Sequence, residues 1–326
     1  MNTFKPTKLA LALKLALVAG VCQQAGAEPF PSRFDLLELD GSNGVAIIGG
    51  SAEELSGFSV SAAGDLNNDG ISDVILGAYL ADNTLGGVDS GRSYIIYGSN
   101  NTFSSPIELN DFSNPDLFSA FGGEAISVTR FSGHSVSGAG DFNDDGVDDF
   151  LIGAPGNRLG SPLQATSGRA YLGFGRAFLS NTFLGSFTGA TGFKINAENA
   201  FDTTIGYSVS SAGDFNGDGI DDILIGATRA DLGGNGRGGR SYILFGTSSI
   251  TSPFEFELSA LDGTNGVVIA KGALDNQFGY SVSSIGDFKG DKLDDVIIGS
   301  PGSSSNGNNS GNSYIVFGTD TLLTSP

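Results

Sequence analysis

Short apolar runs alternate with clusters of Gly, Asn, Asp and Ser along nearly the whole chain. In the first quarter these runs lie at Val45–Ile48, Phe58–Ala62, Val74–Ala78 and Ser93–Tyr97, and they contain β-branched and aromatic residues. Such runs between turn-forming residues predict β-strands. No apolar pattern of helical period follows residue 27. The chain is therefore predicted to be all-β.

The pattern of strands and turns occurs four times. The best-preserved stretch reads GYSVSSAGDFNGDGIDDILIGAT in the third copy, and the first Asp of its acidic loop recurs at steps of 76, 73 and 73 residues. In the fourth copy the predicted strands are Val267–Ala270, Tyr280–Ser284, Val296–Gly299 and Ser313–Phe317. Four short strands in a repeat of this length are typical of a β-propeller blade.

The repeat boundaries divide the chain into a whole number of units. The stretch EPFPSRFDLLELDGSNGVAI, which begins at residue 28, resembles SPFEFELSALDGTNGVVI at residues 252–269. The predicted units are approximately 28–103, 104–178, 179–250 and 251–326, and each is expected to form one blade. No additional strand is expected to join the last blade to the first. Two architectures stay open: a closed ring of four blades, and an open arc whose exposed faces another chain covers.

The acidic loops predict metal binding. Positions 1, 3, 5 and 9 of three loops carry side-chain oxygens, position 6 is Gly, and the carbonyl of position 7 is expected to face inward. The predicted ligands are Asp65, Asn67, Asp69, Ile71 carbonyl and Asp73; Asp141, Asn143, Asp145, Val147 carbonyl and Asp149; and Asp214, Asn216, Asp218, Ile220 carbonyl and Asp222. Such a set of oxygens suits Ca²⁺. An EF-hand is excluded because position 12 lies inside the next strand and no helix follows.

The fourth loop departs from this pattern. Lys289 stands at position 3 and Lys292 replaces the Gly at position 6. We expect the Lys289 ammonium to lie among Asp287, Asp291 and Asp295 and to replace the charge of the metal. About three calcium sites are therefore predicted.

The repeated residues resemble the FG-GAP repeats of the integrin α-subunit β-propeller, over about residues 30–326. "FG" is literal at Phe278-Gly279, "GAP" is literal at Gly153-Ala154-Pro155, and the acidic loop lies between the two motifs in every unit. The resemblance implies a propeller whose calcium loops support the blades and which serves as an extracellular platform for adhesion or ligand binding. The integrin ring has seven blades, so closure of this chain does not follow from the resemblance.

Charge and the N-terminus indicate export. Residues 1–27 combine Lys5 and Lys8 with an apolar run and end in Ala25-Gly26-Ala27, which predicts a signal peptide cleaved before Glu28. Lipidation at Cys22 is a less favoured alternative. The chain carries a net charge of −20, which argues against nucleic-acid partners. A secreted or cell-surface protein of bacterial type is predicted, with the periplasm as an alternative, and no membrane span is expected.

No catalytic constellation is apparent in the sequence. The single histidine, His134, occupies a repeated aromatic position and is predicted to be packed. The G-x-G-x-x-G sequence at 234–239 lies in a loop without a following helix, which argues against dinucleotide binding. Glu53, Glu54, Glu124 and Glu198 have no assigned role, and the recurring Arg92, Arg169 and Arg240 are expected to pair with nearby acids.

Ligand specificity is expected in the loops that vary between units. These are Ala81–Gly91, Gly156–Gly168, Ala230–Gly239 and Gly302–Gly311. The predicted function is a calcium-binding β-propeller, not an enzyme, that binds an extracellular protein or glycan. The alternatives are an extracellular hydrolase with its site in the propeller channel, and a truncated piece of a larger assembly. An open arc would favour a homo-oligomer.

Overall fold

The structure, a computed structural model, describes residues 35–82, 89–111, 113, 117–122, 131–156, 167–175, 184–198, 204–230, 238–249, 255–270 and 277–321. The chain divides into a short unit that ends at Leu39 and a larger unit from Asp40 to Pro326. In the short unit, the 3-10 helix η1 (Leu36–Glu38) is capped by the Asp35 carboxylate, which accepts the Leu37 N–H at 3.1 Å. The predicted signal peptide, including Cys22, lies outside the described residues.

The larger unit is built from β-strands, as predicted. Its described helices are two 3-10 turns, η2 (Leu184–Ser186) and η3 (Leu258–Ala260). Within the described part of the chain, no helix has the length and apolar character needed to cross a bilayer.

Four sheets correspond to the four predicted blades. Blade 1 contains β2 (Ser59–Gly64), β3 (Asp73–Ala78), β4 (Arg92–Ile96) and β6 (Leu117–Gly122). Blade 2 contains β7 (Ser135–Gly140), β8 (Asp149–Ala154), β9 (Arg169–Gly173) and β10 (Gly192–Asn196), with β14 (Glu255–Glu257) added in parallel to β10. Blade 3 contains β11 (Ile205–Gly213), β12 (Asp222–Ala227), β13 (Arg240–Leu244) and β15 (Gly266–Ala270). Blade 4 contains β16 (Ser281–Gly286), β17 (Asp295–Ser300) and β18 (Asn312–Val316).

The grouping of strands into blades differs from the prediction by one strand. The predicted strands are present, but the first strand of a unit pairs with the preceding blade: β15 of the fourth unit lies antiparallel to β13 of the third. The chain turns back along the sheet edge after the third strand, so the next apolar run completes the existing sheet. Within the described residues, no earlier blade is present for the run at Val45–Ile48 to complete. This run forms β1 (Ile47–Ile48), which pairs in parallel with β5 (Ile107–Glu108).

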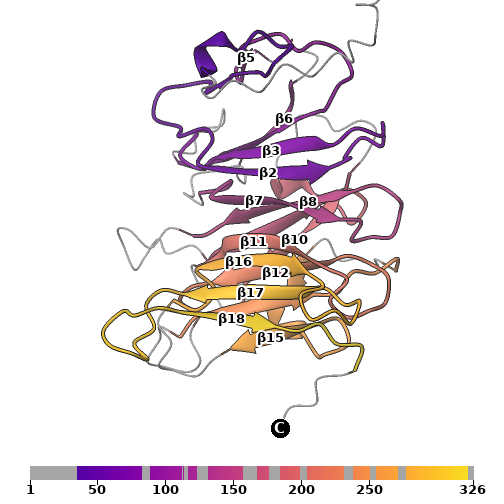
Figure 1. Cartoon of the computed structure of the whole chain (residues 1–326), viewed down its shortest axis with the longest axis vertical. Coiled ribbons are helices and arrows are strands. Elements are labelled where there is room, and N and C mark those ends of the chain that lie inside the picture. Colours follow the sequence, from indigo (N-terminus) through magenta and orange to yellow (C-terminus); the bar gives the residue numbers. More distant parts are fainter. Residues whose placement is uncertain are drawn as a thin grey trace, which may run out of the picture. The chain divides into compact units, whose positions relative to one another are not determined.

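The blades pack through their first strands. β2 packs against β7, β7 against β11, and β11 against β16, and these strands follow one another in Figure 1. Within the described residues, β16 has no comparable packing with β2. The four blades therefore form an open series, and of the two predicted architectures the structure has the unclosed one.

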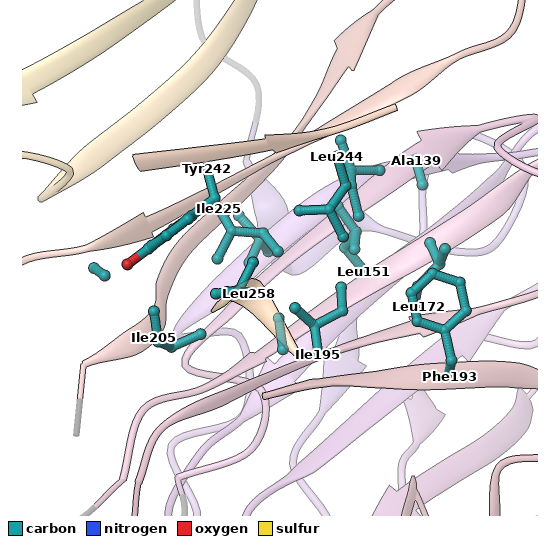
Figure 2. Packing of buried hydrophobic residues seen from close by; sticks show 14 of the residues in the cluster. Ala139, Leu151, Leu172, Phe193, Ile195, Ile205, Ile225, Tyr242, Leu244 and Leu258 are labelled. Carbon is teal, nitrogen blue, oxygen red and sulfur yellow. The ribbon is translucent and has the colours of Figure 1, made fainter. Parts of the chain in front are cut away.

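The core lies between the blades. In the cluster of Figure 2, Leu151 and Leu172 of blade 2 meet Ile225 and Leu244 of blade 3, and all four are almost fully buried. Successive side chains of a strand point to opposite faces of the sheet. On β12, Ile225 accordingly belongs to the cluster with blade 2, whereas the neighbouring Leu224 belongs to the cluster with blade 4.

Burial on both faces explains the apolar composition of the middle strands. All six residues of β8 and all six of β12 are buried. Each end blade packs against another blade on one face only, so β2 and β18 alternate between exposed and less exposed positions. This scaffold places the acidic loops, which join the first strand of each blade to the second, at one end of the sheets.

Candidate metal centres in the acidic loops

Each acidic loop occupies a strand-to-strand hairpin and leads directly into the second strand of its blade. The loops are residues 65–73, 141–149, 214–222 and 287–295, numbered here as positions 1 to 9. No helix follows any of the four, which agrees with the exclusion of an EF-hand.

The position-1 carboxylates turn toward the centre of their loops. Asp65 accepts the Asp69 N–H through Oδ1 at 3.0 Å and the Gly70 N–H through Oδ2 at 2.7 Å. Asp214 accepts the equivalent N–H groups of Asp218 and Gly219, each at 3.0 Å. Asp141 and Asp287 make the same two contacts in their loops. The loops therefore share one conformation, in which the first carboxylate closes the turn.

Positions 3 and 5 face each other across the loop. Asn67 Nδ2 donates to Asp69 Oδ2 at 2.9 Å, and Asn216 Nδ2 donates to Asp218 Oδ2 at 2.9 Å. In the second loop, Asn143 Oδ1 is buried without a hydrogen-bond partner among the described residues. A buried carbonyl oxygen needs a donor or a cation. A hard cation held at positions 1, 3 and 5 fits this oxygen.

The glycine at position 6 has the backbone conformation that the predicted bend requires. Gly70, Gly146 and Gly219 have φ of 84°, 85° and 89°, in the left-handed region that residues with a Cβ avoid. Lys292 occupies the same position of the fourth loop with φ of 75°. The fourth loop thus keeps the bend of the others with an unfavourable residue.

We expect Lys292→Gly to raise the free energy of unfolding by about 1 kcal/mol, because glycine adopts this φ without the Cβ penalty. Urea unfolding would measure the change. Lys292→Ala is the matched control, since it removes the charge but keeps the Cβ. Equal stabilisation by both variants would show that charge, and not backbone conformation, is responsible.

The position-9 carboxylates have a second role that the sequence analysis missed. Asp222 is fully buried and accepts the Phe215 N–H at 3.0 Å, the Asn216 N–H at 3.2 Å and the Gly246 N–H at 2.8 Å. Gly246 follows the third strand of the blade, so this side chain ties the loop to the neighbouring hairpin end. Its equivalents Asp73, Asp149 and Asp295 make corresponding contacts.

Burial makes two of these carboxyl groups, those of Asp149 and Asp222, difficult to ionise. Burial raises the pKa of Asp149 to about 8, and the negative charges of Asp145 and Asp141 act in the same direction. Burial likewise raises the pKa of Asp222 to about 8, with a contribution from the charge of Asp218. A bound divalent cation would favour the ionised forms and reverse this effect.

Stability without metal is expected to fall as pH rises from about 4 to about 8. In the folded state Asp149 and Asp222 have a pKa of about 8 and keep their protons across this interval. In the unfolded chain their pKa returns to the ordinary value of 3.8 and the protons are lost. The folded state binds more protons, so raising the pH favours unfolding. Thermal unfolding across this range in EGTA would measure the trend, and saturating Ca²⁺ is expected to abolish it. A metal-free protein whose stability rises over the same interval would contradict the assignment.

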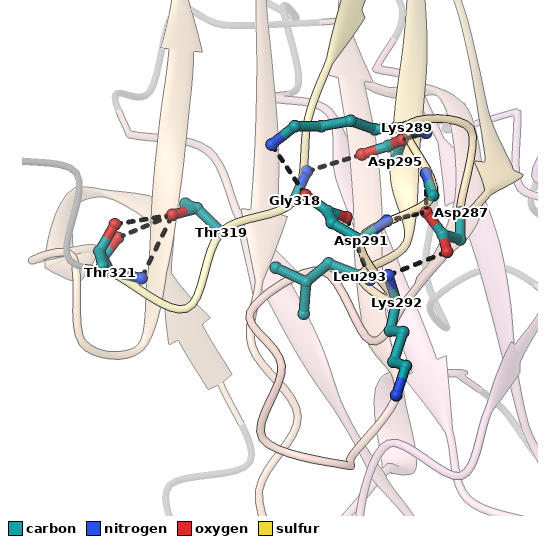
Figure 3. A network of polar contacts seen from close by, with 10 residues as sticks. Asp287, Lys289, Asp291, Lys292, Leu293, Asp295, Gly318, Thr319 and Thr321 are labelled. Atoms are coloured by element: carbon teal, nitrogen blue, oxygen red, sulfur yellow. Dashed lines mark hydrogen bonds and ion pairs between the residues drawn. The ribbon is translucent and has the colours of Figure 1, made fainter.

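The fourth loop holds its own cation (Figure 3). Lys289 Nζ lies 2.8 Å from Asp291 Oδ2 and 5.4 Å from the centre of the Phe317 ring. The hydrogen bond to Asp291 raises the pKa of Lys289, and the same bond lowers the pKa of Asp291. The ammonium therefore contacts Asp291, one of the three carboxylates among which it was expected to lie.

Position 8 links each loop to the blade before it. Asp148 Oδ2 accepts the Asp65 N–H at 2.7 Å, and Asp221 and Asp294 accept the position-1 N–H of the preceding loop, each at 3.0 Å. The first unit has Ser72 at this position. The sequence signal was the Asp-Asp pair at positions 8 and 9 of units two to four, which the analysis of single loops did not use.

Carboxylates alone do not form a metal site in this structure. Among the residues it describes, no group of three or more His, Cys, Asp or Glu side chains is placed to hold a metal ion. The predicted sites also depend on the Asn side chain of position 3 and the carbonyl of position 7. Calcium ligation by the fifteen predicted residues thus stays a prediction.

The other candidate residues are parts of the scaffold. His134 packs between Phe58 and Tyr207, with ring centroids 5.2 and 4.6 Å away, and its Nδ1 lies 3.1 Å from the Tyr207 carbonyl oxygen. Burial lowers the pKa of His134. Arg240 forms an ion pair with Glu198, as expected for the repeated arginines. The predicted packed role of His134 is confirmed.

Comparison with known proteins identifies the repeat. The FG-GAP repeat pattern matches residues 56–96, 132–172, 205–244 and 278–316. The chain is 30% identical over 187 residues to phosphatidylinositol-glycan-specific phospholipase D of Bos taurus, which covers 56% of this chain and 20% of that protein. It is 29% identical over 175 residues to integrin alpha-5 of Xenopus laevis, covering 52% and 14%. It is 25% identical over 250 residues to integrin alpha pat-2 of Caenorhabditis elegans, covering 76% and 18%.

The chain spans a fifth or less of the length of these relatives. Each matched segment coincides with the first three strands of one blade and contains one acidic loop. The chain is therefore an integrin-like protein of four FG-GAP repeats.

Proposed function

We propose that this chain is a calcium-stabilised binding module, exported to the cell surface or the medium, that recognises a protein or glycan and carries out no catalysis. The observation that carries the proposal is that the acidic loops and the variable loops lie at opposite ends of the blades. The acidic loops join the first strand to the second, whereas the variable loops join the second to the third. In antiparallel sheets these connections lie at opposite ends, so metal binding and ligand recognition would be separated.

The fourth variable loop shows what such a surface offers. Residues 302–311 are mostly Ser, Asn and Gly, and 304–310 are exposed. Asn312, at the end of this loop, donates to Ser303 Oγ at 2.6 Å and to Ser305 Oγ at 2.8 Å. Hydroxyl and amide groups held in this way suit the hydrogen-bonding groups of a glycan or a peptide backbone.

The named relatives support an extracellular role without fixing the ligand. The similarity to an integrin alpha chain supports a ligand-binding platform. The phospholipase D is an enzyme by name. The high negative charge of the chain disfavours nucleic acids and anionic lipid surfaces as partners. An extracellular protein or glycan is the class of ligand that we propose.

Binding of the purified chain to a glycan array and to extracellular proteins, in Ca²⁺ and in EGTA, tests the proposal. We expect capture of a ligand in Ca²⁺ that weakens in EGTA, because loss of the metal loosens the blades. A variant with the fourth variable loop replaced by Gly-Ser residues should lose affinity while it keeps its melting temperature. Turnover of a glycan or phosphodiester substrate would contradict the proposal and favour the hydrolase alternative.

A further inference from the structure

Within the described residues, blade 4 has no counterpart of the outer strand that the other three blades have. Blades 1, 2 and 3 each end in an outer strand from the following unit, namely β6, β10 and β15. In blade 4, β18 pairs with β17, and the described residues contain no strand on its other edge. Ile315, which lies on β18 at this unpaired edge, is exposed.

The separate pair of β1 and β5 contains a strand of the outer type, β1, that completes no blade among the described residues. In blade 2, β10 pairs with β9 on one edge and in parallel with β14 on the other, with Ile195 opposite Phe256. β1 pairs with β5 in the same parallel manner, with Ile47 opposite Ile107. β1 therefore has the environment of an outer strand on one edge. The other edge of β1 corresponds to the edge of β10 that pairs with β9, the third strand of blade 2.

The two end faces expose residues that the internal interfaces bury. Val136 and Val209 are each 6% exposed, whereas Val60, at the same position of the repeat, is 71% exposed. At the opposite end, Phe288 is 64% exposed, whereas its equivalents Leu66, Phe142 and Phe215 are at most 3% exposed. Each end face is thus one half of an interface that the chain forms three times internally.

One end face carries a glycine turn, and the other carries a cleft that such a turn would fill. Inside the chain, the Gly133 carbonyl accepts a hydrogen bond from Ser59 Oγ of the preceding blade at 2.8 Å, and the Gly279 carbonyl accepts one from Ser208 Oγ at 2.9 Å. The equivalent Ser281 lies in an open cleft of about 430 Å³ on blade 4, together with Gly299 and Gly311.

The turn that would enter this cleft already has the docked conformation. Gly57, the first-blade equivalent of Gly133 and Gly279, has φ of 84°, against 83° and 81° for those two. The space around the position of a Gly57 Cβ is open, whereas the other two turns approach the preceding blade closely. The Gly57 turn is therefore preorganised for docking.

The aromatic rings beside these turns form a column that runs from one end face of the chain to the other. His134 stacks near Phe58, Tyr207 near His134, and Tyr280 near Tyr207, with centroid separations of 5.2, 4.6 and 5.0 Å. The terminal rings, Phe58 and Tyr280, are 52% and 42% exposed. A Phe58 ring from another molecule would continue the column on Tyr280.

We propose that two copies of this chain associate head to tail, with blade 1 of one copy covering blade 4 of the other. β1 of the first copy adds as the fourth strand of the second copy's blade 4, and its Gly57 turn enters the cleft at Ser281. By analogy with β9 and β10, Val45 lies opposite Ile315 of the other copy and Ala46 lies opposite Tyr314.

One internal contact is not reproduced in this association. Each internal interface has an Asp at position 8 that accepts the N–H of the preceding loop, and blade 1 has Ser72 there. The head-to-tail interface therefore lacks one hydrogen bond to a carboxylate. We expect it to be weaker than the internal interfaces, and hence reversible on dilution.

Sedimentation of the mature chain across a range of concentrations tests the association. Species of twice the chain mass and, because each dimer keeps a free blade 1 and a free blade 4, of higher multiples are expected. Val60→Asp and Phe288→Asp should each give monomers, whereas Val268→Asp, at an exposed apolar position of β15, should not. A mixture of Val60→Asp and Phe288→Asp should recover a dimer, because each variant keeps the half that the other has lost. A wild-type chain that stays monomeric at all concentrations, or a mixture that fails to pair although both variants keep their circular dichroism spectrum, would overturn the proposal.

Cysteine cross-linking tests the strand register and the identity of the partner. In a chain of residues 28–326, which contains no other cysteine, Val45→Cys with Ile315→Cys should form a disulfide-linked dimer on mild oxidation, whereas Val45→Cys with Ser313→Cys should cross-link poorly. A disulfide-linked monomer would show that the chain closes on itself, which would overturn association between two copies. Absence of any cross-link would overturn the pairing of β1 with β18.

Discussion

Excess EGTA is expected to lower the melting temperature of the chain by more than about 10 °C. A ligand present at about 100 times its dissociation constant stabilises the folded state by roughly 2.7 kcal/mol per site, so three calcium sites would contribute about 8 kcal/mol. This is a large share of the stability of an ordinary domain. Differential scanning calorimetry in Ca²⁺ and in EGTA measures the shift.

Two comparisons make this result specific to calcium. Adding back Ca²⁺ in excess over EGTA should restore the original midpoint, and Mg²⁺ at the same concentration should restore it only in part, because Mg²⁺ tolerates irregular coordination poorly. A midpoint that does not move when EGTA is added would show that the loops are closed turns held by their own hydrogen bonds.

Asp222→Ala is expected to lower the free energy of unfolding by about 3 kcal/mol, even in EGTA. The substitution leaves the buried N–H groups of Phe215 and Gly246 without their acceptor, and each unpaired buried amide costs about 1–3 kcal/mol. Relief of the carboxyl group's own burial offsets part of this cost. Urea unfolding in EGTA, where the metal contribution is absent, measures the effect.

Asp218→Ala is the matched control from the same loop. The Asp218 carboxylate is exposed and accepts the Ile220 N–H at 3.0 Å, so its loss in EGTA should cost less than about 1 kcal/mol. In Ca²⁺ both variants should be strongly destabilised. If Asp222→Ala were as mild as Asp218→Ala in EGTA, position 9 would be a metal ligand only and not a structural tie.

The strands were predictable because each short apolar run is bounded by turn-forming residues. Residues 149–154 and 222–227 are apolar beyond their first Asp because neighbouring blades cover both faces of these strands. The grouping into blades was not predictable from the repeat alone. A repeat can be cut at any strand, and only the pairing of β15 with β13 shows that the blade boundary lies one strand later.

The acidic loops show the same limit at the level of single residues. The spacing of oxygens and the Gly at position 6 identified the loops, and Lys289 identified the loop with its own cation. The spacing could not show that Asp149 also binds backbone amides, or that Asp148 reaches the preceding blade. Both contacts join segments that are distant in sequence, so a motif read within one loop does not contain them.

The number of calcium ions bound per chain tests the central claim most directly. Equilibrium dialysis followed by metal analysis should give three per wild-type chain, two for Asp218→Ala and three for Asp291→Ala, because Lys289 already pairs with Asp291 in the fourth loop. A wild-type chain that binds no calcium would contradict the account. Four ions per wild-type chain would show that the fourth loop binds metal despite its lysines.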